Sequence, residues 1–340
     1  MPAVREWVDP EGVPVSILTR RSRGPVKDIF FALEVAWNIW RLRNQYDVVY
    51  FLMQGLHLTT GLPAARWLNK PIIMKFSGSG VIPHMKNSLA GRLEVKWLAR
   101  WARRIMVLND DMVEEAVEAG LPRRSLLWMP NPVNTCQFQP LSRDAISEWR
   151  ERHGLPQEAT LVIYTGRLSQ EKGLTQLLRG FAQASPGAPG MMLLLVGDGA
   201  QRAELEALAR QLNLGPGQVR FTGRVEPRQI PIWLGSSDVF ALLSPSEGFS
   251  CALLEGMSSG LASVVTAIPA NGQLIEDHVH GLMVPFDDDA AAAQAFLDLF
   301  RRVEMRRSMG SAARDRVLEN FSTGRVVERY EILLAEVLGL

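Results

Sequence analysis

The 340-residue chain contains only two cysteines, Cys136 and Cys251, and no long uninterrupted apolar run. Two cysteines cannot form the framework of a small disulfide-rich secreted domain, so a reducing compartment fits the composition. The most apolar stretch, residues 29–40, is broken by Glu34 and Asn38 and is too short to span a bilayer core of about 30 Å. The first residues lack the apolar core of a signal peptide. We therefore expect a cytoplasmic protein, held at most peripherally on the inner face of a membrane.

The chain also lacks a strong net charge, because its formal charge is +1, but its charges are unevenly distributed. Residues 1–140 hold 18 Lys and Arg against 12 Asp and Glu, whereas the remainder holds 19 against 24. A basic first half and an acidic second half suit a two-domain protein whose first domain meets an anionic partner. Chance variation on two solvated surfaces explains the asymmetry equally well. We expect no nucleic-acid partner.

Strand-like apolar runs alternate with helical patterns along the whole chain, which is typical of parallel sheets with crossover helices. The prediction is an α/β protein of two Rossmann-like, doubly wound domains. The predicted strands cover residues 47–53, 71–76, 104–109, 125–129, 160–164, 191–196, 219–222, 238–243 and 262–266. The predicted helices cover residues 28–43, 58–68, 88–103, 111–119, 172–184, 200–212, 227–235, 251–260 and 325–337, and the run Ala290–Ala293 also lies in a predicted helix.

The best linker candidate is the segment 129–141, which contains Pro130, Pro132 and Pro140. We therefore predict a first domain over residues 1–138 and a second domain over residues 139–324. Residues 325–340 can pack back on the first domain.

The most informative stretch is Ser244-Pro-Ser-Glu-Gly-Phe-Ser-Cys-Ala-Leu-Leu-Glu255, which follows a predicted strand and opens a predicted helix. The first N–H groups of a helix have no partner within the helix and can receive an anion such as phosphate. Glu247 and Glu255 would repel a phosphate, but carboxylates readily accept hydrogen bonds from sugar hydroxyls. The combination indicates a phosphorylated, polyhydroxylated ligand, namely a nucleotide sugar.

A basic pair, Arg167 and Lys172, follows the first predicted strand of the second domain. Each residue alone would usually be a surface charge. Beside a strand end in a doubly wound sheet, where ligands bind, the pair is suited to the charge that develops on a diphosphate leaving group. Two further strand ends precede Gly199 and Gly223, and for each of them alone a plain tight turn is the favoured interpretation.

Together these segments resemble the family-four, group 1 retaining glycosyltransferases, which have the GT-B fold. The resemblance covers nearly all of the second domain and, more loosely, residues 45–140. The matching segments are Gly166-Arg-Leu-Ser-Gln-Glu-Lys-Gly173, Val196-Gly-Asp-Gly199, Phe221-Thr-Gly223, Pro245-Ser-Glu-Gly-Phe-Ser-Cys-Ala-Leu-Leu-Glu255, Gly281-Leu-Met-Val-Pro285 and the linker.

The resemblance implies roles for individual residues. Arg167 and Lys172 would hold the donor diphosphate, Glu247 would face the donor sugar, and Glu255 would bind the ribose hydroxyls. Arg167, Lys172 and Glu247 are then the expected catalytic residues. No metal or other cofactor is expected, because the basic pair replaces a cation. The other implied donor-binding positions are Gly166, Gly223, Gly248, Phe249, Ser250 and Leu254.

The expected function is transfer of a sugar, with retained configuration, from a nucleotide diphosphate sugar to a hydroxyl of a saccharide or lipid-linked acceptor. The expected setting is the synthesis of polysaccharide, lipopolysaccharide or glycolipid. The start of the chain departs from the family pattern, because the usual first strands and the Gly-rich loop facing the donor phosphates are not found. A fragment, a misplaced start and loss of that loop are three explanations. A degenerate nucleotide-sugar-binding homologue or partner subunit is therefore the main alternative. A GT-B epimerase has less support.

Residues 88–104 carry a second pattern, in which Arg92, Lys96 and Arg100 form one stripe beside a stripe of Trp97 and Trp101. A basic amphipathic helix with tryptophan can lie on an anionic membrane. Packing of both tryptophans in the core, with a solvated basic face, is the favoured alternative. The helix predicted at 28–43 is apolar over most of its circumference, and we expect it to be buried. The alternative is an exposed apolar patch where further N-terminal elements of the family would cover it.

Overall fold

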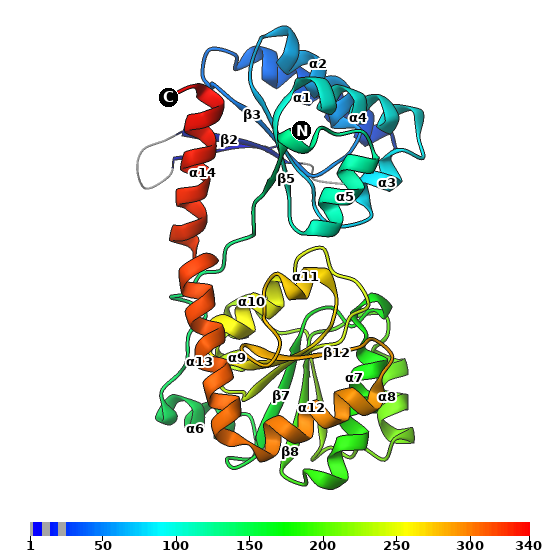
Figure 1. Cartoon of the computed structure of the whole chain (residues 1–340), viewed down its shortest axis with the longest axis vertical. Coiled ribbons are helices and arrows are strands. Elements are labelled where there is room, and N and C mark those ends of the chain that lie inside the picture. The colour runs from blue at the N-terminus through cyan, green and yellow to red at the C-terminus, as the bar shows by residue number, and fades with distance from the viewer. Residues whose placement is uncertain (1–2, 9–13, 20–24) are drawn as a thin grey trace. The chain divides into compact units, whose positions relative to one another are not determined.

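The computed structural model describes residues 3–8, 14–19 and 25–340 and divides into two compact units. The first unit comprises Met1–Met129 with Tyr330–Leu340, and the second comprises Pro130–Arg329. The boundary between Met129 and Pro130 therefore falls at the start of the predicted linker. The boundary between Arg329 and Tyr330 lies inside the last helix of the chain. Each unit is built on its own parallel sheet, which confirms the predicted α/β class (Figure 1).

Four parallel strands in the order β3-β4-β5-β6 form the sheet of the first unit. The two central strands hold apolar residues such as Ile73, Met74 and Ile105, which are fully or almost fully buried. Helices follow the strands in sequence, as the alternating pattern predicted. The elements are β3 (Val49–Leu52), α2 (His57–Trp67), β4 (Ile72–Lys75), α3 (Val81–Met85), α4 (Leu89–Trp101), β5 (Ala102–Val107), α5 (Asp110–Glu118), η1 (Arg123–Ser125) and β6 (Leu126–Trp128).

Two antiparallel strands precede this sheet, β1 (Ala3–Val8) and β2 (Pro14–Thr19), and neither was predicted. Residues 7–18 resemble a family segment that normally lies later in the chain, and residues 9–13 of this segment lie outside the described residues.

The prediction that the helix at 28–43 is buried is wrong. Helix α1 (Pro25–Arg41) packs on α2 through one stripe that includes Ala32, Val35 and Ile39. Its other apolar side chains have no such cover within the described part of the chain, because only one neighbouring helix is present to bury them. The exposed large apolar residues of α1 are Val26, Ile29, Phe30, Leu33, Trp37 and Trp40.

The C-terminal end of α14 (Thr323–Leu338) packs on the sheet of the first unit. The Tyr330 hydroxyl lies 3.2 Å from the Tyr50 hydroxyl and also accepts a hydrogen bond from Lys75 Nζ at 3.2 Å. Arg104 forms a bidentate ion pair with Glu336. These contacts tie the last turns of the chain to β3, β4 and β5.

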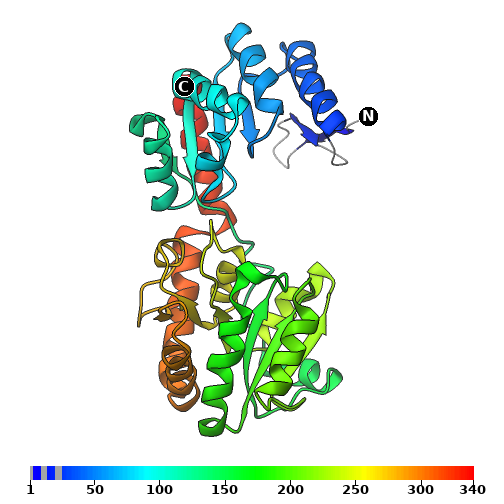
Figure 2. The same ribbon diagram turned by 90° about the vertical axis from the view of Figure 1, so that its right-hand side faces the viewer.

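The second unit contains a six-stranded parallel sheet in the order β12-β11-β10-β7-β8-β9. Helices α7 and α8 lie against one face, and α9 and α10 against the other (Figures 1 and 2). The strands are β7 (Thr160–Thr165), β8 (Met191–Val196), β9 (Val219–Gly223), β10 (Val239–Leu242), β11 (Ala262–Thr266) and β12 (Gly281–Val284). Every residue of the four strands β7, β8, β10 and β11 is buried, so the core lies along the centre of this sheet.

Three α-helices of the second unit, α6, α11 and α13, were not predicted. The full set is α6 (Arg143–Arg152), η2 (Gln170–Lys172), α7 (Leu174–Ala184), η3 (Ser185–Gly187), α8 (Arg202–Gln211), η4 (Pro227–Gln229), α9 (Ile230–Gly235), α10 (Cys251–Ser258), α11 (Pro269–Gly272), α12 (Asp289–Arg301) and α13 (Val303–Asn320). Within the described residues, no helix is both long and apolar enough to cross a bilayer.

Candidate functional site

The sheet of the second unit changes its direction of winding between β7 and β10, which lie side by side. From β7 the sheet extends through β8 and β9 on one side, and β10, β11 and β12 lie on the other. The loops that follow β7 and β10 therefore lead to helices on opposite faces of the sheet. In open α/β sheets, ligands bind at such a point, beyond the carboxyl ends of the strands. Arg167 and Lys172 follow β7, while Glu247 and Glu255 follow β10.

Two glycines allow the loops at this edge to lie in direct backbone contact. Gly173 has a φ of +63°, and a Cβ added there would lie 1.8 Å from the carbonyl oxygen of Leu243, at the end of β10. Gly197 has a φ of +143°, and its Cβ would lie 1.8 Å from the carbonyl oxygen of Gly166. A side chain at either position would force the loops apart.

Hydrogen bonds link the loop that follows β7 to the loops that follow β8 and β9. The N–H of Leu168 donates to the carbonyl of Asp198 at 3.0 Å, and the N–H of Gln201 donates back to the carbonyl of Leu168 at 3.0 Å. The carbonyl of Gly223 accepts from the N–H of Gly197 at 3.1 Å. The edge is therefore a connected surface of backbone, with Gly166 and Gly223 within it.

Lys172 and Glu247 meet directly across the β7–β10 boundary. Lys172 Nζ lies 2.9 Å from Glu247 Oε1 and 3.1 Å from Oε2. The Glu247 side chain is 9% exposed and that of Lys172 is 25% exposed, so the pair is largely shielded from water. The carboxylate of Glu247 therefore holds the Lys172 ammonium at the boundary between β7 and β10.

Arg167 stands apart from that pair on the surface of the same loop. Its side chain is 74% exposed, and its Nη1 lies 3.9 Å from Glu171 Oε1. An exposed ion pair at this separation holds a side chain only weakly, so the guanidinium is free to turn toward a ligand. The backbone of the loop is better fixed, because the Tyr164 hydroxyl donates to the carbonyl of Arg167 at 2.8 Å.

Helix α10 presents its amino-terminal end to the same edge. The side chain of Ser250 caps it by accepting a hydrogen bond from the N–H of Leu253 at 3.2 Å. Leu253 and Leu254 are fully buried and anchor the helix on the core. The segment formed by Gly248 and Phe249 runs directly into this cap, next to the first N–H groups of the helix.

Glu255 lies on α10 in a partly buried position. Burial raises the pKa of its carboxyl group to about 7, because removal from water disfavours the charged form. The neutral and ionised forms are therefore both present near neutral pH.

Sequence reasoning singled out four charged residues, Arg167, Lys172, Glu247 and Glu255. It missed two side chains, Tyr164 and Glu171, that contact Arg167. Tyr164 fixes the Arg167 backbone, and its position next to the end of a buried strand was the signal available. Glu171 pairs with Arg167 and accepts a hydrogen bond from Ser169 Oγ at 2.7 Å, which lowers the pKa of Glu171. The family motif indicates a role only for the two cations of this loop, Arg167 and Lys172.

Residues 145–316, half of the chain, match the family described as "Glycosyl transferases group 1". The chain belongs to this family. Among curated proteins, EpsD of Bacillus subtilis, which is named as a glycosyltransferase, is 29% identical to this chain over 248 residues. The matched residues make up 72% of this chain and 63% of EpsD. The N-acetyl-alpha-D-glucosaminyl L-malate synthase of Bacillus anthracis is 24% identical over 234 residues, which make up 69% of this chain and 60% of that enzyme. The chain thus spans less than two thirds of either relative.

Solved structures share the fold over most of the chain. HepE of Anabaena, determined in complex with UDP, superposes with a TM-score of 0.79 at 20% identity and covers 90% of this chain and 82% of its own. Sucrose-phosphate synthase of Thermosynechococcus elongatus superposes with a TM-score of 0.77 at 22% identity. The superposition covers 98% of this chain and 83% of that enzyme. The predicted group 1 family and GT-B fold of two Rossmann-like domains are confirmed.

Proposed function

We propose that this group 1 family member transfers a sugar, with retention of configuration, from a nucleoside diphosphate sugar to an acceptor hydroxyl. The observation that carries the proposal is the Lys172–Glu247 pair at the point where the sheet of the second unit reverses. One partner of this pair suits a phosphate and the other suits a sugar hydroxyl, so a ligand with both groups can engage each of them.

The chemistry that this site favours is departure of the nucleoside diphosphate assisted by positive charge. The bond between the anomeric carbon and the β-phosphate oxygen breaks, and the acceptor oxygen bonds to the same face of the sugar. The acceptor proton passes to an oxygen of the departing phosphate. Lys172 and Arg167 stabilise the charge that develops on the diphosphate, a role that electrostatic groups in a preorganised site fill well. We propose that this pair makes a metal ion unnecessary.

Carboxylates complete the proposed donor site. When the diphosphate engages Lys172, Glu247 becomes available to accept hydrogen bonds from hydroxyls of the transferred sugar. Glu255, on the neighbouring helix, accepts from the two ribose hydroxyls. The backbone of Gly248, Phe249 and Ser250 approaches the phosphate or sugar at the start of α10.

Structural relatives give a first choice of donor and acceptor class. HepE was determined with UDP-glucose and with UDP and glucose. The related proteins include a lipopolysaccharide core glycosyltransferase from Rhizobium meliloti and a sulfoquinovosyl transferase from Arabidopsis thaliana. We propose a saccharide or lipid-linked acceptor, used in the assembly of a polysaccharide, lipopolysaccharide or glycolipid.

Calorimetric titration with UDP, GDP and ADP, followed by release of that diphosphate from the matching nucleotide sugar, tests the proposed function. We expect one of the three to bind clearly more tightly and its sugar conjugate to be slowly hydrolysed, with water as the acceptor. Tight nucleotide binding without any release or transfer would favour a nucleotide-sugar-binding homologue. If none of the three binds, the assignment fails.

The raised pKa of Glu255 predicts a pH-dependent affinity for UDP-glucose. The ionised carboxylate accepts hydrogen bonds from both ribose hydroxyls, so affinity should be full above about pH 7 and should fall below it, by up to about tenfold per pH unit. Glu255→Gln should bind more weakly at pH 8 and lose this dependence. Titrations between pH 5.5 and 8 would measure both effects, with exposed Glu204→Gln on α8 as the control. An unchanged pH profile in Glu255→Gln would contradict the assigned role.

A further inference from the structure

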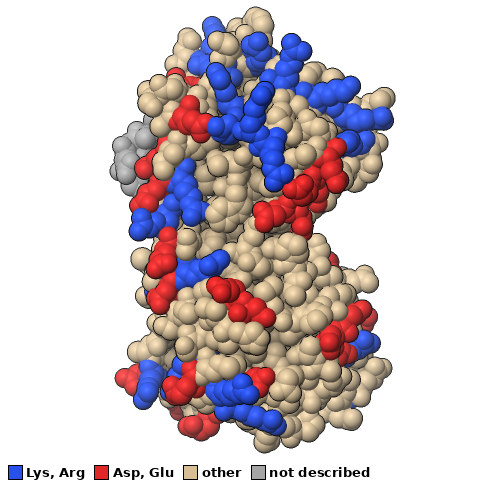
Figure 3. Space-filling model, in the orientation of Figure 1, with Lys and Arg blue, Asp and Glu red and all other residues tan. Residues whose placement is uncertain are grey.

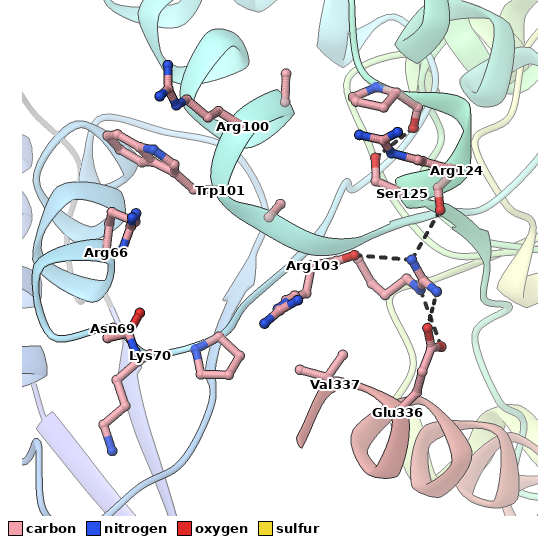
Figure 4. Close-up of a pocket in the computed structure, with 15 residues that line it drawn as sticks. Arg66, Asn69, Lys70, Arg100, Trp101, Arg103, Arg124, Ser125, Glu336 and Val337 are labelled. Atoms are coloured by element: carbon pink, nitrogen blue, oxygen red, sulfur yellow. Dashed lines mark hydrogen bonds and ion pairs between the residues drawn. The ribbon is translucent and has the colours of Figure 1, made fainter. Parts of the chain in front are cut away.

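A basic hollow lies at the amino-terminal edge of the sheet of the first unit. It has a volume of about 800 Å³ and is formed where α2 and α4 end and where β4, β5 and β6 begin. Figure 4 shows basic side chains arranged around it. This edge is opposite the carboxyl edge of the same sheet, where the loop 77–80 lies and where ligands of such sheets bind. Its basic residues are Arg66, Lys70, Arg100, Arg103, Arg104 and Arg124.

Most of the positive charge of this hollow is not balanced by carboxylates. Glu336 is the acidic residue in the lining, and it pairs with Arg104. In the described part of the chain, no ion pair joins the remaining guanidinium groups to a carboxylate. These groups belong to four exposed arginines, Arg66, Arg100, Arg103 and Arg124. Figure 3 shows Lys and Arg side chains gathered over the first unit.

A second hollow, rich in tryptophan, adjoins the basic one and shares Arg66, Arg100 and Trp101 with it. Trp67 is 75% exposed, and Leu93 and Leu89 on α4 are also exposed. Trp97 and Trp101 stack on each other with ring centroids 5.3 Å apart, and neither belongs to the core. The favoured prediction that these two tryptophans are core residues is therefore wrong, because α4 buries the stripe of Val95 and Leu98 instead.

The exposed face of α4 carries no negative charge that would oppose the arginines. Its acidic residue, Glu94, is only 4% exposed and lies on the buried side. Arg92 and Lys96 are exposed and extend the positive surface from the hollow along the helix. Arg66 and Arg100 stand in the last turns of α2 and α4, where a cation also stabilises the helix. Arg103 and Arg124 lie outside both helices, so helix stabilisation alone does not explain the cluster.

We propose that this basic and tryptophan-rich face of the first unit docks on the surface of a membrane that contains anionic phospholipids. The negative surface potential of such a membrane attracts clustered arginines. Tryptophan side chains favour the membrane–water interface, at the level of the lipid headgroups. Protruding apolar side chains beside the cations favour a bilayer over a nucleic acid, because they can enter the headgroup layer. The proposal does not depend on the proposed function and extends the surface beyond the helix 88–104.

Flotation of the full chain with lipid vesicles tests the proposal. The vesicles are phosphatidylcholine alone or with about one third phosphatidylglycerol, at about 0.05 M and about 0.5 M NaCl. The charge variant combines Arg66→Gln, Arg100→Gln, Arg103→Gln and Arg124→Gln. A matched control removes the same charge from four exposed arginines of the second unit, Arg179, Arg210, Arg228 and Arg301. A third variant, Trp67→Ala with Trp97→Ala, tests the aromatic part.

We expect the wild type and the control to float with anionic vesicles at low salt but not with neutral ones. The charge variant should bind at least about tenfold more weakly, and the tryptophan variant should lose the binding that survives in high salt. Circular dichroism and nucleotide titration should be unchanged in the charge and tryptophan variants, since their substituted side chains belong to the first unit and lie outside its core. Equal binding by the charge variant, or equal binding to neutral vesicles, would overturn the proposal. Tighter binding to an RNA oligomer than to anionic vesicles would also overturn it.

Discussion

Replacement of Lys172 by alanine should lower the rate of sugar transfer or donor hydrolysis by about 100-fold to 1,000-fold. The ammonium lies at the boundary between β7 and β10, where the leaving diphosphate is expected, and it is positioned before the reaction by Glu247. The loss should appear mainly in kcat, because the charge on the leaving group grows as its bond to the sugar breaks. Measurement of UDP release under saturating UDP-glucose would show it.

A purely structural role of Lys172 needs to be separated from this electrostatic role. Lys172→Ala leaves Glu247, which is 9% exposed, without its partner, and removal of one member of a shielded pair also destabilises a protein. The double variant Lys172→Met with Glu247→Gln removes both charges and should recover most of the thermal stability, but not the activity. Arg210→Ala, on the exposed side of α8, is the surface control. Recovery of activity together with stability would show that the pair only holds the loops in place.

Replacement of Gly173 by alanine should have the largest effect on the folded second unit. Its φ of +63° disfavours a side chain, and the new Cβ would lie 1.8 Å from the carbonyl oxygen of Leu243. A Cβ is fixed rigidly to the backbone, and the carbonyl oxygen is itself backbone, so relief requires that the loops after β7 and β10 separate. We expect a loss of about 3 kcal/mol or more in the free energy of unfolding, and nucleotide binding weakened by more than tenfold.

The chain offers a matched control for this substitution. Gly217 lies in a loop of the same unit, and a Cβ there would meet nothing within 4 Å. Gly217→Ala should melt within a few degrees of the wild type, whereas the calorimetric transition of the second unit should move well down in Gly173→Ala. Similar melting temperatures for the two alanine variants would show that the β7–β10 loop contact is not close-packed.

The sequence predicted the parts of this structure that depend on local patterns. The buried runs at 160–164 and 191–196 correspond to β7 and β8, because fully buried parallel strands are continuously apolar. Strand β12 was missed because its apolar run, Leu282–Val284, has only three residues between Gly281 and Pro285, too few for a clear pattern. The exposed face of α1 was only the alternative to burial, since an apolar sequence does not reveal whether a neighbour is present to cover it.

Features made from distant parts of the chain were beyond sequence reasoning. Lys172 and Glu247 were each singled out as ligand-binding residues, but their direct contact arises because β10 pairs with β7. The basic hollow draws on residues near 66, 100, 124 and 336, which no local motif connects. In both cases the order of strands in the sheet, and not the spacing along the chain, brings the charges together.

The ion pair between Lys172 and Glu247 also has a consequence for turnover. If the proposed function holds, a diphosphate has to displace the Glu247 carboxylate to reach the Lys172 ammonium, because the two side chains are in direct contact. Glu247 would then compete with the diphosphate, and its return would offset the electrostatic cost of leaving the ammonium without a partner in a shielded position. In that reaction, the side chain that binds the sugar would also promote release of the nucleotide product.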